Sequence, residues 1–132
     1  MKNVLLSIVL MFQMTSCAAV IKFPVSSLEP TAEITAQIKK DKQNNYLISI
    51  TANYLASVER LSPPKKTYVV WIVTKNGISN IGQMKSKNAK KSTLETLTSF
   101  EPQEIFITAE DEGNVTYPTG MEISRAVLKD NL

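Results

Sequence analysis

The sequence predicts an all-β protein, an antiparallel immunoglobulin-like β-sandwich of about seven strands. Three observations support this prediction. Apolar and polar side chains alternate in several short segments, polar or glycine-containing turns separate these segments, and residues 68–74 form a run of β-branched and aromatic residues between Pro63-Pro64 and Gly77. Alternation with a period of two puts neighbouring side chains on opposite faces of a strand, and short strands with frequent turns are typical of sandwiches.

The first 17 residues have the pattern of a lipoprotein signal. Lys2 gives a positive start, residues 4–11 form an apolar run, and the run leads to Met14-Thr15-Ser16-Cys17. The run is shorter than the roughly 20 residues that cross a bilayer. The last four residues resemble the lipobox of bacterial lipoproteins, in which a peptidase cuts before an acylated cysteine, although leucine is more usual at the position of Met14. We therefore expect a signal peptide at 1–16 and a fatty acyl group such as palmitate on Cys17.

Two other interpretations of this segment remain open, an ordinary signal peptide with Cys17 buried as a free thiol, and an uncleaved anchor. Cys17 is the single cysteine of the chain, so no intramolecular disulfide can form and the domain must be held by its core. Ala18-Ala19-Val20 contains neither an inner-membrane retention aspartate nor an acidic export run. We expect an outer-membrane lipoprotein that faces the periplasm, with residues 17–30 as a tether.

The predicted sandwich domain covers residues 31–127, and residues 128–132 form a polar tail. A hairpin is expected from residues 32–38 and 46–52, and the central strand from 68–74 returns through Asn76-Gly77 to 79–84, where Gly82 permits a bulge. Three further strands are expected at 92–98, 105–109 and 121–126. The predicted core consists of Ile34, Ile48, Ile50, Val70, Ile72, Ile105, Ile107 and Ile123.

The central strand is apolar on both faces. Val70 and Ile72 are assigned to the core, which leaves Val69, Trp71 and Val73 on a second apolar face. A sandwich strand normally needs only one apolar face. There are two alternatives. The face is an exposed partner-binding surface, or it is covered by the apolar residues of the preceding crossover loop, Leu55, Val58 and Leu61.

Two charged loops are candidate sites. The first is basic and holds Lys85, Lys87, Lys90 and Lys91, which suggests either a phosphate or anionic-lipid contact or a solvated hairpin tip. The second is acidic, at Glu110-Asp111-Glu112. It suggests a carboxylate pair of the glycosidase kind, a weak Ca²⁺ site using Asp111 and Asn114, or a solvated turn. Neighbouring side chains diverge in a turn, which favours the solvated interpretation.

Composition excludes several kinds of chemistry. The chain contains no histidine, which removes Ser-His and Cys-His nucleophiles and the usual zinc ligand sets. Its four glycines form no phosphate-binding loop. The formal charge of +3 falls to +2 when Lys2 is removed with the signal, too little to favour nucleic acid. We predict no catalytic residue, metal or cofactor, and the sequence leaves the oligomeric state open.

Several segments resemble one family. Four segments are similar to the C-terminal extracytoplasmic domain of anti-sigma-K factors. They are residues 68–71 before a glycine turn, Ile81-Gly82, the expected strand at 105–110 before an acidic glycine turn, and Tyr117-Pro118-Thr119-Gly120. The similarity covers residues 49–125. It implies an antiparallel β-sandwich and brings no catalytic residues. The resemblance does not imply sigma-factor regulation. In those proteins a sigma-binding domain and a transmembrane helix precede this module, whereas here we expect the hydrophobic run that ends at Cys17 to be a lipoprotein signal.

These features predict a non-enzymatic cell-envelope lipoprotein whose sandwich acts as a binding or structural module with a possible protein partner. The alternative is a carbohydrate-binding or adhesin-like module, which would expose Trp71 or tyrosines for stacking against sugars. A hydrolase that uses the acidic turn is the less favoured third interpretation.

Overall fold

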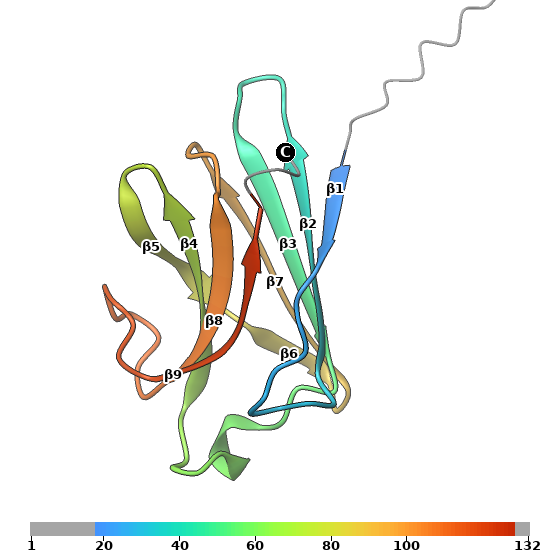
Figure 1. Ribbon diagram of the computed structural model, residues 1–132, viewed down its shortest axis with the longest axis vertical. Coiled ribbons are helices and arrows are strands. Elements are labelled where there is room, and N and C mark those ends of the chain that lie inside the picture. The colour runs from blue at the N-terminus through green and yellow to red at the C-terminus, as the bar shows by residue number, and fades with distance from the viewer. Residues whose placement is uncertain (1–17, 129–132) are drawn as a thin grey trace, which may run out of the picture.

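Two antiparallel sheets face each other in the computed structural model, which describes residues 18–128 (Figure 1). The predicted all-β sandwich is therefore confirmed. Sheet A has the order β1-β2-β3-β7-β6, with bounds Ala18–Lys22, Glu33–Lys40, Tyr46–Asn53, Lys91–Thr98 and Lys85–Asn88. Sheet B has the order β5-β4-β8-β9, with bounds Gly77–Gln83, Thr67–Thr74, Glu104–Glu110 and Met121–Val127.

The predicted first hairpin is formed by β2 and β3, which pair along their whole length. Its turn is held by Asp41, whose Oδ1 accepts backbone N–H bonds from Gln43 and Asn45, both at 2.9 Å. Asn44 occupies the left-handed region at a φ of 63°, a conformation that asparagine tolerates better than most residues. The local turn chemistry thus fixes the register that puts Ile48 and Ile50 in the core.

Nine strands are present in residues 18–128 rather than about seven, and the two additions correct the predicted boundaries. Residues 18–22, expected in the tether, form β1, which pairs with β2 from Ala18 opposite Lys39 to Lys22 opposite Thr35. Phe23 then enters the core, and the Ser124 hydroxyl donates to the Pro24 carbonyl at 2.8 Å. The two prolines and two serines that suggested a tether all lie after β1, in residues 24–30, and the edge of β2 offers backbone partners to residues 18–22.

The second addition is β6, which lies in the predicted basic loop and pairs with β7 at the opposite edge of sheet A. Its residues, Lys85 and Lys87 among them, are all exposed. The basic segment is therefore a hairpin whose lysines point into solvent.

Sheet B is built around β4, the predicted central strand, which lies between β5 and β8. The pairing of β4 with β5 shifts between Val70 and Trp71, where Val70 lies opposite Gly82 and Trp71 opposite Asn80. Gly82 has a φ of 134°, which only glycine adopts readily. The bulge expected at Gly82 is thus present.

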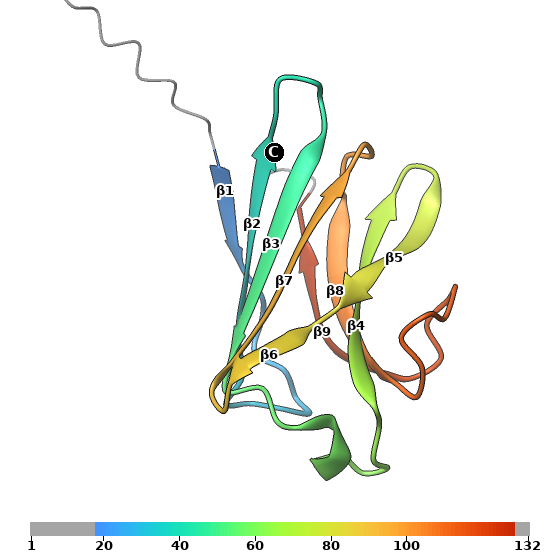
Figure 2. The ribbon, with the colours of Figure 1, turned by 180° about the vertical axis from the view of Figure 1, so that it is seen from behind.

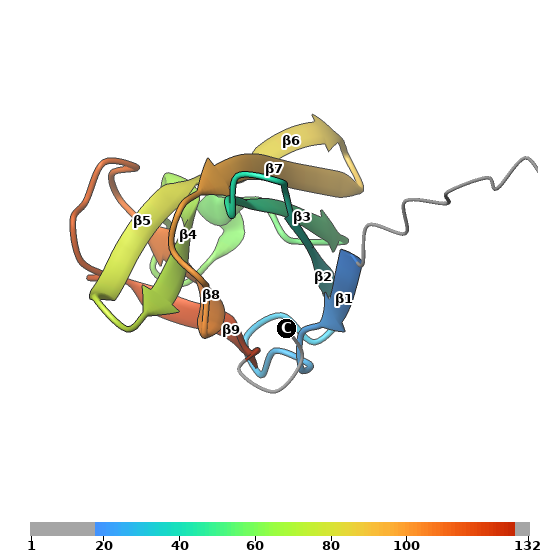
Figure 3. The same cartoon turned by 90° about the horizontal axis from the view of Figure 1, so that it is seen from above.

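The shared core lies between the two sheets, which Figure 3 shows facing each other around a common centre. All eight predicted core residues are buried in it: Ile34, Ile48, Ile50, Val70, Ile72, Ile105, Ile107 and Ile123. Val70 and Ile72 point inward, while Trp71 belongs to a separate cluster on the outer side of sheet B. The sequence therefore predicted the orientation of the central strand correctly.

The two ends of the sandwich carry different connections. At the N-proximal end β1 begins, and three connections lie there, residues 41–45, 75–76 and 99–103 (Figures 1 and 2). At the distal end β3 leads into the segment 54–66, which contains a single 3-10 turn at Val58–Arg60, and β6 leads into β7. Among residues 18–128, no helix is long and apolar enough to cross a membrane.

Candidate functional site: a covered sheet and a distal hollow

The second apolar face of β4 is closed by the chain itself. Val69 and Trp71 have no exposed surface, and Phe106 of β8 is 2% exposed beside them. The Trp71 and Phe106 rings stack with centroids 6.1 Å apart, and the Arg125 guanidinium lies 4.0 Å from the centre of the Phe106 ring. Val69 and Trp71, two of the three residues named for a partner site, are therefore buried in the domain, and Val73 is half-buried.

A different segment from the expected one covers this face. Val115, from the loop of residues 111–120, packs against Trp71 and its neighbours, and we call this loop the covering loop. It lies outside β4 and β5 in both side views (Figures 1 and 2). The sequence pointed to the segment 54–61 as the cover, but Leu55, Val58 and Leu61 pack into the shared core instead.

Glu110 fixes the covering loop. The sequence favoured a solvated acidic turn here, but Glu110 is the last residue of β8 and has no exposed surface. Its carboxylate accepts hydrogen bonds from the hydroxyls of Thr108 and Thr119, both at 2.5 Å, and from the N–H of Gly120 at 3.1 Å. Burial raises the pKa of Glu110, but these donors outweigh burial and hold its pKa below the ordinary value. The hydrogen bonds that hold the covering loop thus also stabilise the charged form of this carboxylate.

The other acidic residues of this turn do not join Glu110 in a cleft. The Asp111 carboxylate is exposed and lies 3.4 Å from the Lys65 ammonium, and Glu112 is exposed. Within residues 18–128 no group of three or more acidic or cysteine side chains is placed to hold a metal ion. Glu110 is therefore buried in its own hydrogen-bond network, while Asp111 and Glu112 face solvent.

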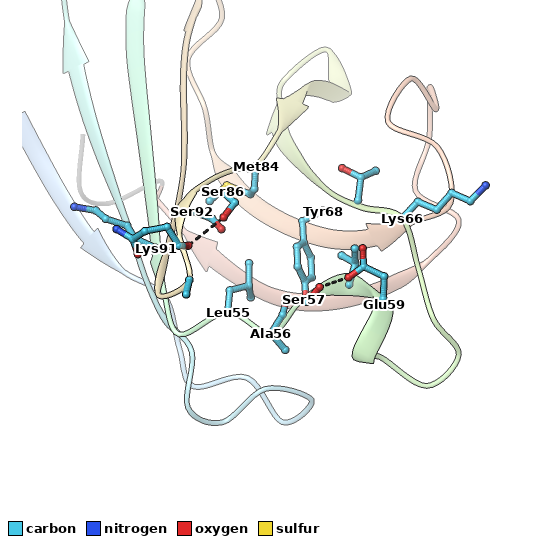
Figure 4. A pocket seen from close by; sticks show the side chains of 14 residues that line it. Leu55, Ala56, Ser57, Glu59, Lys66, Tyr68, Met84, Ser86, Lys91 and Ser92 are labelled. Atoms are coloured by element: carbon cyan, nitrogen blue, oxygen red, sulfur yellow. Dashed lines mark hydrogen bonds between the residues drawn. The ribbon is translucent and has the colours of Figure 1, made fainter.

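A hollow of about 340 Å³ opens at the distal end, and we call it the distal hollow (Figure 4). Leu55, Tyr68 and Met84 contribute its apolar surface. Its polar groups come from the segment 54–66, from β6 and from β7, and include Ser57, Glu59, Lys66, Ser86, Asn88, Lys91 and Ser92. Figure 4 shows Lys66 and Lys91 extending away on opposite sides.

The base of the distal hollow is held by a second buried carboxylate. Glu29 is 6% exposed, and its Oε1 accepts the Ala56 N–H at 2.6 Å. The Tyr68 hydroxyl lies 2.8 Å from Glu29 Oε2 and 2.7 Å from the Ala56 carbonyl oxygen. Burial, followed by the hydrogen bond to Glu29, raises the pKa of Tyr68 far above its ordinary value, so the phenol stays protonated as a donor.

These contacts hold one wall of the distal hollow by hydrogen bonds and leave polar groups at its rim. The segment 54–58 is tied to Glu29 and Tyr68, while hydroxyl, amide and ammonium groups are left at the rim. Glu59 is the single carboxylate among the lining residues. It is exposed, and its hydrogen bond from the Ser57 hydroxyl lowers its pKa. Such a site can bind an amphipathic ligand, with apolar parts on Leu55 and Met84 and polar parts at the rim.

Glu29 is not identifiable from the sequence, because it lies in a segment with the composition of a tether. Its partners, Ala56 and Tyr68, are far away in the sequence, so no local spacing indicates the contact.

Cys17, the predicted lipidation site, lies outside the described residues. The basic side chains Lys85, Lys87 and Lys90 are exposed, and Lys91 borders the distal hollow.

Comparisons with models of protein families, with curated proteins and with solved structures found no match for this chain.

Proposed function

We propose that the protein is a non-enzymatic cell-envelope lipoprotein, held in the membrane through Cys17, whose β-sandwich binds a partner or ligand at the distal hollow. The resemblance of residues 49–125 to the extracytoplasmic domain of anti-sigma-K factors supports an envelope binding module. The lipobox-like sequence before Cys17 supports the membrane anchor.

The observation that carries the binding role is the way the distal hollow is built. Two buried hydrogen-bonded groups, Glu29 and Tyr68, hold one wall, while the groups at the rim remain exposed. A rigid wall lowers the conformational entropy lost on binding. The two buried carboxylates, Glu29 and Glu110, each hold a loop in place, which supports structural rather than catalytic roles for them.

The anchor is tested by fractionation. The full chain should partition with membranes and carry acyl groups detectable by mass spectrometry, and Cys17→Ser should become soluble or retain its signal. A Cys17→Ser protein that fractionates like the parent would show that the lipobox interpretation is wrong.

The binding role is tested by crosslinking in cells followed by purification of the protein. Ser57→Trp places a large side chain at the rim of the distal hollow and should abolish capture of the crosslinked partner. Ser79→Trp, at an exposed position of β5 away from the hollow, is the matched control and should leave capture unchanged. Equal capture by both variants would contradict a role for the distal hollow.

A further inference from the structure

The start of β1 restricts how the domain can lie on a membrane. Ala18, the residue after Cys17, already pairs with Lys39 of β2. Consecutive Cα atoms are about 3.8 Å apart, so no spacer separates an acyl-cysteine from the sheet. With an acyl chain on Cys17, the N-proximal end must therefore lie at the bilayer surface.

The N-proximal end has side chains that suit this position. Phe100 is 48% exposed in the connection from β7 to β8, and Ile78, Leu97 and Val127 near the same end are 49%, 57% and 54% exposed. Apolar and aromatic side chains at such a surface can enter the interface between headgroups and acyl chains.

Charged and polar groups surround these apolar side chains. Lys40 at the end of β2 and Lys42 and Lys75 in the turns of this end are exposed, with Glu101 as an exposed acidic neighbour. Between the three connections lies a hollow of about 460 Å³ lined by polar groups that include Asn44, Lys75, Asn76 and Ser99, with Phe100 beside them. Lysines next to apolar side chains are typical of surfaces that contact anionic headgroups.

We propose that the N-proximal end is a lipid-contacting surface, with Phe100 inserted at the bilayer interface and Lys40, Lys42 and Lys75 over the headgroups. This inference rests on the proposed lipid anchor and adds the orientation of the domain. Strands of eight residues are about 26 Å long, so the distal hollow points away from the membrane, toward a partner in the envelope.

The test uses the full chain, acylated in cells and reconstituted in vesicles of phosphatidylethanolamine and phosphatidylglycerol. Cys17 is blocked by acylation, so one new cysteine can carry a spin label. Phe100→Cys labels the N-proximal end, and Tyr54→Cys labels the distal end as the matched control, since Tyr54 is also an exposed aromatic residue, at 53%. Electron paramagnetic resonance then measures accessibility to oxygen, which enters lipid, and to a nickel chelate, which stays in water.

The expected result is a label at position 100 that is several-fold less accessible to nickel than the label at position 54, and more accessible to oxygen. An acylated, vesicle-bound protein with equal nickel accessibility at both positions would overturn the inference and leave the proposed function standing. Dipolar broadening at position 100 would also overturn it, because a second copy would then cover this end. A chain that is not acylated and does not float with vesicles contradicts both the inference and the proposed anchor.

Discussion

The outer faces of the two sheets differ although both sheets share one core. On sheet A, the outward residues of β2 and β3 include Gln37, Ser49 and Thr51, and none of these is buried. On sheet B, the outward residues Val69, Trp71 and Phe106 are buried beneath the covering loop. One half of the domain is therefore a single sheet facing water, whereas the other half carries a third layer.

This difference shows that an apolar face and its cover need separate explanations. Apolar burial explains why Trp71 avoids water, but the covering loop places only Val115 in the apolar cluster. Polar contacts position the loop: Asn80 Nδ2 donates to the carbonyl oxygens of Gly113 and Val115, both at 2.9 Å, and Glu110 accepts from Thr119 and Gly120. The cover is thus held mainly by hydrogen bonds to buried or half-buried groups of sheet B.

Removing Trp71 should have the largest effect. Trp71→Ala is expected to lower the free energy of unfolding by about 3–5 kcal/mol, because it leaves a cavity and removes the indole N–H that the Thr108 hydroxyl accepts. Thr51→Ala on the open face of sheet A should change it by less than about 0.5 kcal/mol. Urea denaturation measures both. Emission of Trp71 in the parent should be blue-shifted and resistant to quenchers, and a solvent-exposed emission would contradict the covered face.

Glu110→Gln should have the next largest effect, about 2–3 kcal/mol at neutral pH, because hydrogen bonds to a buried charge are lost. The pKa of Glu110 is lowered in the folded protein, so its contribution is present above the unfolded carboxylate pKa of about 4.3. That contribution is lost as the pH falls through the lower folded pKa. The stability difference between parent and variant, followed by urea denaturation against pH, should therefore shrink in acid.

The control for this pH dependence is Glu95→Gln, at an exposed position of β7 on sheet A. It should shift stability by less than about 0.5 kcal/mol at neutral pH. A pH-independent difference between parent and Glu110→Gln would refute the charged hydrogen-bonded state of Glu110.

Two glycines of the covering loop give a smaller, matched comparison. A Cβ at Gly120 would lie 1.7 Å from the Ala109 carbonyl oxygen, which is backbone and cannot move away easily. A Cβ at Gly113 would instead meet the end of the Gln83 side chain, which can rotate away. Gly120→Ala should cost about 1–3 kcal/mol, and Gly113→Ala clearly less. Equal melting temperatures for the two variants would show that the loop does not lie on β8 in this way.

The sequence predicted those parts of the fold that depend on local pattern. Alternation in β2 and β3 identified Ile34, Ile48 and Ile50 as core, and the run at 68–74 identified the central strand with Trp71 outward. Gly82 indicated the bulge. All of these depend on a period of two and on backbone preferences that a short segment contains.

The parts that the sequence did not predict depend on contacts between distant segments. β1 is a strand because the edge of β2 is available to it, whereas the prolines and serines that suggested a tether follow it in residues 24–30. Glu29 and Glu110 have the sequence context of surface carboxylates, as most carboxylates do, and their donors are known only once the fold is known. The Tyr117-Pro118-Thr119-Gly120 turn is recognisable in the sequence, but its contact with Glu110 is not.

Tyr68→Phe should have the smallest effect and tests whether the two buried carboxylates act alike. Glu29 keeps the Ala56 N–H when the Tyr68 hydroxyl is removed, whereas Glu110 has several donors in the covering loop. We expect a loss of about 1 kcal/mol, as for one ordinary hydrogen bond, because the aromatic ring still fills its place in the core. Amide exchange should quicken at Ala56 and stay unchanged at Thr119, since the segment 54–58 and the covering loop are fixed by different carboxylates. Faster exchange at both amides would mean that the two loops open together, and the distal hollow would then lose the independent rigid wall on which its proposed binding role depends.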